Sequence, residues 1–416
     1  MRRTTGAVFL IQHGDLECRY STPPRAAEAA TFYAEPWQNP ASAYPYGIGH
    51  RPTGDDWRCV ALETDVTWAE IGRTADRLGE LFGALEQVAQ PEDLVLLSST
   101  CLPSKLGDDP RIGELLRKSQ VRAPVLYNAP DVDQSVPPLV ELLRRALHEG
   151  HEPRQPKLPH TINLVGFPRS ADKAALVRLL ADAGITVNVD LLPDVDLDDM
   201  GRFHAAPLTV LFPERHLEAI YQRLFDDLDG ERIAPPAPYG LAASHQWLSA
   251  IAQALGRGTA GDRAWQLHRR RLRPELEPLL RDLDGRAVGF IGSRAELKSL
   301  TDPGQTQGVP LFAMLEEMGV GAGWFEFAPE PPPAGSTRPG RSTFGSANEL
   351  RELLAASECD AVYSDVAWDR RITGAGKVPI SLGLFRLGPD GFLQSATELL
   401  RACRFRFYRD YREFLT

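Results

Sequence analysis

The chain has 416 residues, too many for one ordinary hydrophobic core, so its length predicts two or three domains. Hydrophobic residues make up 43% and charged residues 25%, which excludes a largely disordered chain, and a formal net charge of −10 argues against nucleic acid as a partner. The apolar runs are shorter than the ~18 residues of a membrane span. The N-terminal apolar segment is too short for a signal peptide, so we expect a cytoplasmic protein without a membrane partner.

The first part of the chain alternates short apolar runs with amphipathic stretches, which is typical of an α/β domain. An apolar strand is predicted at residues 6–11. Residues 21–58 are rich in proline, glycine and aromatic residues and indicate a long loop. Further elements then alternate in the order helix 67–88, strand 94–97, helix 111–118, strand 125–127 and helix 137–148. We therefore expect an N-terminal α/β domain over residues 1–150.

A proline-rich linker at residues 151–159 leads into a second unit with the same alternation. It begins with the apolar strand 161–166, and Gly184 ends the helix that follows. The elements expected here are strand 161–166, helix 171–183, strand 185–189, strand 208–211, helix 214–228 and a long helical stretch over 244–283. This order predicts a second Rossmann-like domain over residues 158–285.

A third unit repeats the pattern of strand, glycine and helix. Its expected elements are strand 286–292, helix 310–318, strand 322–327, a proline- and glycine-rich surface loop over 329–340, helix 347–357 and strand 361–363. We expect a third Rossmann-like domain over residues 286–375, followed by a C-terminal return segment with a helix over 376–416. The chain is thus predicted to have an α/β fold of three Rossmann-like domains, with parallel sheets flanked by helices. No strand–glycine turn completes the G-x-G-x-x-G motif, so no dinucleotide is expected.

The chain has five cysteines, an odd and sparse set that argues against a disulfide framework. No C-x-x-C pair exists, which argues against a self-contained zinc or ferredoxin site. Cys18 and Cys101 each come shortly after a predicted strand, so both thiols can meet at one edge of the sheet, and Cys59 lies between them in the sequence. A buried structural cysteine is the alternative for each, and for Cys59 it is the favoured one. Cys359 and Cys403 are expected to be packing residues.

Around these cysteines the sequence resembles the component 1 subunits of nitrogenase and nitrogenase-like reductases. "HGDLEC" (residues 13–18) is similar to the family's His-Gly-x-x-x-Cys, and "STCLPSKLGDDP" (residues 99–110) is similar to its Ser-Thr-Cys motif followed by Gly-Asp-Asp. "LETDVTW" (residues 62–68) is similar to the segment between them. Weaker similarities follow in the family's order along the chain: "INLVG", "PYGLAAS", "VGFIGSRAEL" and "CDAVYSDVAWDRRITGAGKVPISLGLFRLG".

The resemblance implies the nitrogenase component 1 fold and an iron–sulfur cluster ligated by Cys18 and Cys101 at the interface with a related subunit. Thiolates are soft ligands that suit such clusters. The cluster-binding nitrogenase subunits carry a further cysteine near the N-terminus, and this chain lacks it. Three alternatives remain open: Cys59 is the third ligand, Asp15 supplies an oxygen ligand, or the cluster is a 4Fe-4S form and not a P-cluster-like 8Fe form.

The resemblance also implies which subunit this chain is. In the catalytic α-type subunits a cysteine and a histidine of the later domains hold the large metal cofactor. This chain has no cysteine between Cys101 and Cys359, and residues 364–368 contain no histidine. It therefore resembles the β-type subunit, which relays electrons and carries no catalytic residue. The expected partners are an α-type subunit, in an α2β2 heterotetramer, and an iron-protein ATPase, because this chain has no Walker motif.

The predicted substrate follows from the positions where the sequence departs from the nitrogenase pattern. The departures from the nitrogenase pattern favour a relative that acts on another substrate. A methylthio-alkane reductase, which cleaves carbon–sulfur bonds, is the expected type, and a dark tetrapyrrole reductase is the next. Two other functions stay open: the β-type half of a cofactor-assembly scaffold, and a non-catalytic α/β binding protein that has lost the metal.

Overall fold

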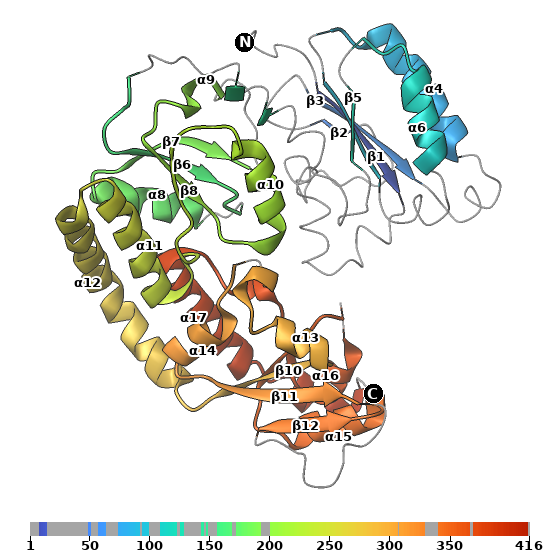
Figure 1. The fold of residues 1–416 in the computed structure, drawn as a ribbon. Helices are drawn as coiled ribbons and strands as arrows, with labels where there is room; N and C mark the ends of the chain where they lie inside the picture. The colour runs from blue at the N-terminus through green and yellow to red at the C-terminus, as the bar shows by residue number, and fades with distance from the viewer. Residues whose placement is uncertain are drawn as a thin grey trace. The chain divides into compact units, whose positions relative to one another are not determined.

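The three-dimensional structure of the chain is a computed structural model (Figure 1). It forms two compact units, the first of residues 1–157, 191–205 and 218–229, and the second of residues 158–190, 206–217 and 230–416. The structure describes residues 8–14, 49–50, 57–63, 74–91, 94–99, 109–122, 125–128, 143–144, 147–148, 156–168, 172–192, 200–306, 308–328, 340–366 and 369–414.

The first sheet has five strands in the order β2-β3-β1-β4-β5. Its strands are β1 (Val8–Gly14), β2 (Gly49–His50), β3 (Trp57–Glu63), β4 (Leu94–Ser99) and β5 (Val125–Asn128). All pairs are parallel except β2 with β3. The loop predicted over 21–58 was wrong at β2 and at the start of β3, because Gly49–His50 has no apolar run and the apolar run of β3 begins only at Cys59.

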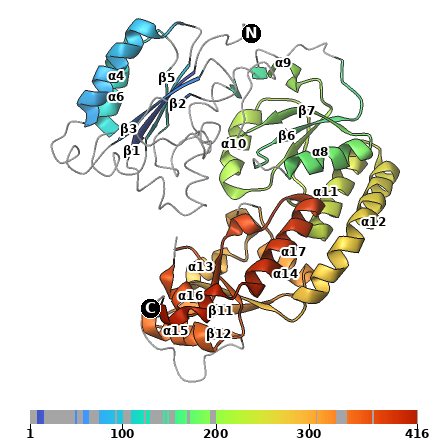
Figure 2. The same ribbon diagram turned by 180° about the vertical axis from the view of Figure 1, so that it is seen from behind.

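One face of this sheet is covered by α4 (Thr74–Val88) and α6 (Asp109–Lys118), which lie side by side in both views (Figures 1 and 2). The apolar side chains Leu78, Phe82 and Leu85 of α4 recur at helical spacing and are buried. Val95 and Leu97 of β4 are two residues apart, face the same side of the strand and are also buried. These five side chains belong to one hydrophobic cluster, so the helix and strand periodicities predicted here are confirmed.

The second sheet has the strand order β7-β6-β8-β9. Its strands are β6 (Thr161–Val165), β7 (Thr186–Leu191), β8 (Leu208–Leu211) and β9 (Glu231–Ile233). The helices of this region are α8 (Lys173–Asp182), α9 (Met200–Phe203) and α10 (Arg215–Phe225). Every residue of β6 is buried. Gly184 follows α8 with φ +70°, a conformation that favours glycine and ends the helix as predicted.

The long helical stretch predicted over 244–283 is two helices, α11 (Gly240–Ala254) and α12 (Gly258–Leu283). The predicted helical stretch is therefore confirmed with one break, where Gly256 adopts φ +66°, which no right-handed helix contains. A C-terminal helix, α17 (Gly388–Arg404), packs beside both (Figures 1 and 2).

A polar contact joins α12 to the first turn of α17. Nε2 of the buried His268 lies 3.1 Å from Oδ2 of Asp390, and Nη2 of Arg271 donates to Oδ1 at 2.7 Å. The hydrogen bond from His268, together with the nearby positive charges, holds the pKa of Asp390 below its ordinary value of 3.8. A carboxyl group whose pKa is lower in the folded chain stabilises it above the unfolded-state pKa and loses that effect as the pH falls through the folded-state pKa.

We therefore expect Asp390→Asn to be less stable than the parent at pH 7, with a difference that shrinks as the pH falls below about 4. Urea unfolding monitored by circular dichroism between pH 7 and pH 3 measures this difference. Asp262→Asn, an exposed position on the same α12, is the matched control and should follow the parent throughout. A difference for Asp390→Asn that does not change with pH would contradict the assignment.

The third sheet has five parallel strands in the order β12-β11-β10-β13-β14. They are β10 (Ala287–Ser293), β11 (Gly321–Phe327), β12 (Arg341–Phe344), β13 (Ala361–Ser364) and β14 (Val378–Ile380). The helices around it are α13 (Arg294–Ser299), α14 (Leu311–Glu317), α15 (Ala347–Ala356), α16 (Arg370–Gly374) and α18 (Phe407–Asp410). β14 comes from the segment 376–416 and extends this sheet beside β13.

The three sheets with their flanking helices confirm the predicted α/β fold. Among the described residues, no helix combines the length and the apolar character that a membrane crossing requires.

Candidate functional site

The carboxyl edge of the first sheet is the candidate site. In the register of the sheet, Gly14 of β1 is paired with Glu63 of β3, and His13 of β1 is paired with Ser99 of β4. The last residues of these three parallel strands therefore lie level with one another. After β1 the chain first adds β2 and β3 on one side of β1, and it then crosses to the other side, where it adds β4 and β5. In open α/β sheets, ligands bind outside the carboxyl ends of the strands at such a switch point, which here falls between β1 and β4.

Two of the three predicted ligands follow these two strands in the sequence. Cys18 comes four residues after the end of β1, and Cys101 comes two residues after the end of β4. Both cysteines, and Asp15 with them, lie outside the described residues. The structure thus describes the strand ends that precede these cysteines and leaves the cysteines themselves as predictions.

Cys59 occupies a different level of the sheet. It is the third residue of β3, where its backbone is paired with Leu10 of β1 and Gly49 of β2. The carboxyl end of β3 is Glu63, four residues further on. At about 3.3 Å per residue, the backbone of Cys59 lies roughly 13 Å from that edge.

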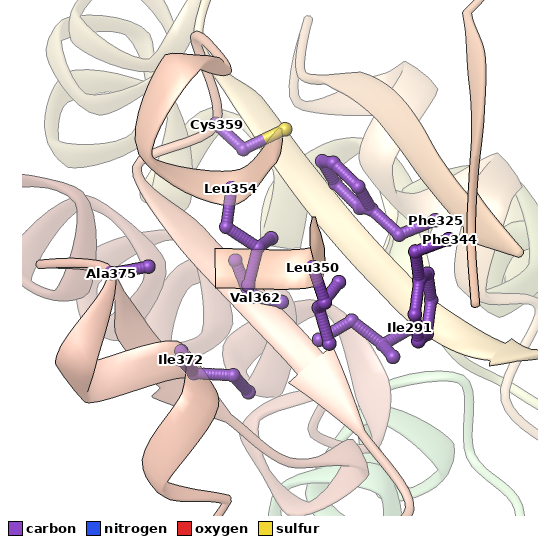
Figure 3. Packing of buried hydrophobic residues seen from close by; sticks show 9 residues of the cluster. All are labelled: Ile291, Phe325, Phe344, Leu350, Leu354, Cys359, Val362, Ile372 and Ala375. Carbon is purple, nitrogen blue, oxygen red and sulfur yellow. The ribbon is translucent and has the colours of Figure 1, made fainter. Parts of the chain in front are cut away.

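The remaining two cysteines are buried in the second unit, as expected for packing residues. Cys359 precedes β13 and belongs to a hydrophobic cluster with Phe325 and Val362 (Figure 3). A Cβ built on Gly323 of β11 would lie 2.8 Å from the Sγ of Cys359, so this thiol occupies the space that a missing side chain leaves. Cys403 lies on α17.

Burial changes the acidity of both thiols. It raises the pKa of Cys359, and it raises the pKa of Cys403 to about 12, with the negative charge of Asp360 adding to the second shift. A metal ligand or nucleophile must be the thiolate, and these two groups stay protonated at neutral pH. Burial and the raised pKa values of Cys359 and Cys403 therefore agree with a packing role for both residues.

A thiol-labelling experiment checks this prediction. A pKa of about 12 in place of 9.0 leaves Cys403 with about a thousandfold less thiolate at pH 8. We expect iodoacetamide to leave Cys359 and Cys403 unmodified in the folded chain and to modify both in urea, as read by peptide mass spectrometry. Fast modification of either residue in the folded chain would contradict the assignment.

The switch point of the third sheet carries a polar cluster that the sequence analysis did not single out. Asp369 is the N-cap of α16, is 5% exposed, and accepts hydrogen bonds from Ser364 Oγ (2.9 Å) and from Arg371 Nε (2.8 Å) and Nη2 (2.7 Å). Burial pushes its pKa upward, but the donors from Arg371 and Ser364 outweigh burial, and the pKa of Asp369 is lowered. The N-cap pattern Asp-Arg-Arg after a strand is the signal that would have found this cluster.

The carboxylate of Asp369 is satisfied within the chain, since its donors are a bidentate guanidinium and a hydroxyl. Among the described residues, no group of three or more histidine, cysteine or acidic side chains has the geometry to hold a metal ion. The hydrogen bonds of this cluster attach the start of α16 to the end of β13. The carboxyl edge of the first sheet remains the candidate site.

Known proteins share both the sequence pattern and the fold. The chain is 25% identical over 246 residues to the B subunit of the light-independent protochlorophyllide reductase of Synechococcus elongatus, covering 52% of this chain and 48% of the relative. It is 26% identical over 235 residues to the corresponding polypeptide of Roseiflexus sp. (strain RS-1), covering 52% and 41%. The chain thus spans about half the length of these curated relatives.

A solved structure described as "Nitrogenase Cp1 at pH 5" has a TM-score of 0.59 with this chain at 13% identity, and the match covers 97% of this chain and 86% of the other. At that identity the match shows a common fold. The family model described as "Nitrogenase component 1 type Oxidoreductase" matches residues 75–321. Since that match covers more than half of the sequence, the chain belongs to the nitrogenase component 1 type oxidoreductase family.

Proposed function

We propose that this chain is the β-type subunit of a nitrogenase-like, ATP-dependent reductase and that it holds an iron–sulfur cluster jointly with an α-type partner. One observation carries the proposal: the adjacent strands β1 and β4 end level at a switch point, and each is followed within four residues by a cysteine. Two thiolates at one sheet edge are the donors that an iron–sulfur cluster requires.

Cys18 and Cys101 are the proposed ligands from this chain. The position of Cys59, four residues before the carboxyl end of β3, argues against the third ligand that the sequence suggested. A cubane cluster takes four protein ligands, so two must come from a second chain. This count favours a 4Fe-4S cluster over a P-cluster-like 8Fe form. When bound, the cluster supplies one-electron transfer, and the part of this chain is to fix it at the sheet edge beside the partner.

The electron source in this proposal is a separate iron-protein ATPase, because the sequence of this chain contains no Walker motif. The α-type partner carries the reaction, and this chain relays electrons. The relatives are each named as one of the subunits of a reductase, which supports a role for this chain beside other subunits.

Two substrates are proposed. The sequence departures favour a thioether, as in the methylthio-alkane reductases, and the relatives named protochlorophyllide reductase favour a tetrapyrrole. The reconstituted three-component complex, supplied in turn with a methylthio-alkane and with protochlorophyllide, distinguishes the two by product analysis. A complex that retains iron but reduces neither substrate would favour the assembly-scaffold alternative.

Co-expression tests the shared site directly. Produced anaerobically without its partner, the chain should bind little stable iron, because it lacks a full ligand set. With the α-type chain it should elute from size-exclusion chromatography as an iron-containing heteromer, expected to be α2β2. A full complement of oxygen-sensitive cluster in the monomeric chain, or a colourless and iron-free heteromer, would contradict the proposal, and the second result would favour the non-catalytic alternative.

A further inference from the structure

The chain that follows α17 exposes four large aromatic side chains within ten residues. Phe405, Phe407 and Tyr411 are each about half exposed, and Phe414 is 82% exposed. Ring centroids lie 6.2 Å apart for Phe405 and Phe407, and 5.0 Å apart for Phe407 and Tyr411. Single exposed apolar side chains are ordinary on a protein surface, whereas a contiguous group marks an interaction surface.

Arginines alternate with these rings, and all of them are exposed: Arg404, Arg406, Arg409 and Arg412. We call residues 404–414 the arginine–aromatic patch. Arg404 pairs with Asp282 at 2.7 Å, and Arg409 lies 3.8 Å from its neighbour Asp410. In the described part of the chain, no carboxylate lies within ion-pair distance of the other two arginines. Arginine and aromatic residues are the types that dominate binding energy at protein interfaces.

The patch is attached to the third sheet through the turn after α16. A Cβ built on Gly376 would lie 3.2 Å from the Cα of Arg409, so the two backbones are in close contact. The adjacent Lys377 donates to the backbone carbonyl of Ser357 at 2.9 Å. Burial lowers the pKa of Lys377, and the positive charges of Arg409 and Arg412 act in the same direction. The patch is therefore a positive region fixed on a folded surface.

The charge of the patch is opposite to that of the rest of the chain. Its eleven residues contain four arginines and two acidic residues, a formal charge of +2, while the whole chain carries −10, which leaves −12 on the remainder. The patch combines positive charge with exposed apolar rings. A protein surface that presents carboxylates beside apolar side chains matches it in both respects.

A second copy of the chain fits the patch poorly. In a two-fold symmetric contact the same patch meets itself, which would place arginines against arginines. If the patch instead contacted an acidic surface of another copy, the contact would be heterologous. Copies would then assemble into an open row, and the patch of the last copy would stay uncovered. A different protein avoids both problems.

We propose that the arginine–aromatic patch docks a separate protein that presents carboxylates around an apolar centre. The aromatic rings supply the apolar contact, and Arg406 and Arg412 supply charge-assisted hydrogen bonds to carboxylates. The proposal goes beyond the function proposed above, because none of these residues belongs to the cluster site.

Binding of a random copolymer of glutamate and tyrosine to the full-length chain, measured by fluorescence anisotropy, tests this surface. Reversing two charges, in Arg406→Glu with Arg412→Glu, should weaken binding at least about tenfold, because like charges then face the ligand. Replacing two rings, in Phe407→Ser with Tyr411→Ser, should also weaken binding while leaving the charge of the patch unchanged. The matched control is Arg269→Glu with Arg270→Glu, two exposed arginines of α12, which should change binding less than about twofold.

Circular dichroism shows whether each variant is folded, and the single variant Arg412→Gln replaces the double variant if it is not. Absence of copolymer binding by the parent chain, or an equal loss in the α12 control, would overturn the proposal. Tighter binding to phosphatidylserine vesicles or to single-stranded DNA, with the same dependence on Arg406 and Arg412, would also overturn it. So would self-association of the parent that the charge reversal abolishes, as measured by sedimentation.

Discussion

Replacing Cys18 or Cys101 by alanine is expected to remove most of the iron from the co-expressed complex. Each substitution deletes a cysteine that follows β1 or β4 in the sequence, and neither water nor a hydroxyl replaces a thiolate well as a ligand of an iron–sulfur cluster. Iron content per heteromer and the electron paramagnetic resonance spectrum of the reduced complex measure the loss.

Two other cysteine variants serve as controls. Cys403→Ala should keep its iron, because this thiol is buried on α17 with a pKa raised to about 12. Cys59→Ala distinguishes ligation by Cys18 and Cys101 alone from ligation that also uses Cys59. Retained iron supports the first alternative, and lost iron supports the second. Unchanged iron and an unchanged spectrum in both Cys18→Ala and Cys101→Ala would end the cluster hypothesis.

The second large effect is expected in the third sheet, where Gly323→Ala should destabilise the second unit by about 1–3 kcal/mol. The added methyl group would lie 2.8 Å from the Sγ of Cys359 and 3.8 Å from Cε2 of Phe325. The first distance is too short for a carbon–sulfur contact, so the strand or the thiol must move. Figure 3 shows the sulfur of Cys359 pointing toward the ring of Phe325, and both side chains belong to one buried cluster, which limits that movement.

A double-mutant cycle tests the cause. Cys359→Ala removes the sulfur, so adding it to Gly323→Ala should recover part of the lost stability, whereas alone it should destabilise by leaving a small cavity. Gly321→Ala is the matched control on the same strand, since a Cβ there would make only ordinary contacts, 3.6 Å from the carbonyl oxygen of Arg286 and 3.9 Å from Cβ of Ala287. Urea unfolding of the parent, the two single variants and the double variant gives the coupling free energy between positions 323 and 359. If the effects of the two single variants simply add up in the double variant, the added methyl group clashes with a group other than Cys359.

Three of the strands that the sequence analysis missed, β9, β12 and β14, share a physical property. The burial patterns of β9, β12 and β14 show that almost all of their residues are at least partly exposed, so none has the apolar run that predicts a buried strand. The strands it found, such as β6 and β8, are almost wholly buried. The break between α11 and α12 was missed because Gly256 inside an apolar helical pattern gives only a weak local signal.

By itself the sequence determined the α/β class, most of the helices and strands, and the placement of Cys18 and Cys101 just after two apolar strands, because all of these follow from local periodicity. Only the tertiary structure decided which strands are neighbours. It placed β1 beside β4 at a switch point, set Cys59 four residues from the sheet edge, and put Cys359 against Gly323 of another strand. Strand order and register are set by pairing between residues far apart in the chain, and local patterns do not encode that pairing.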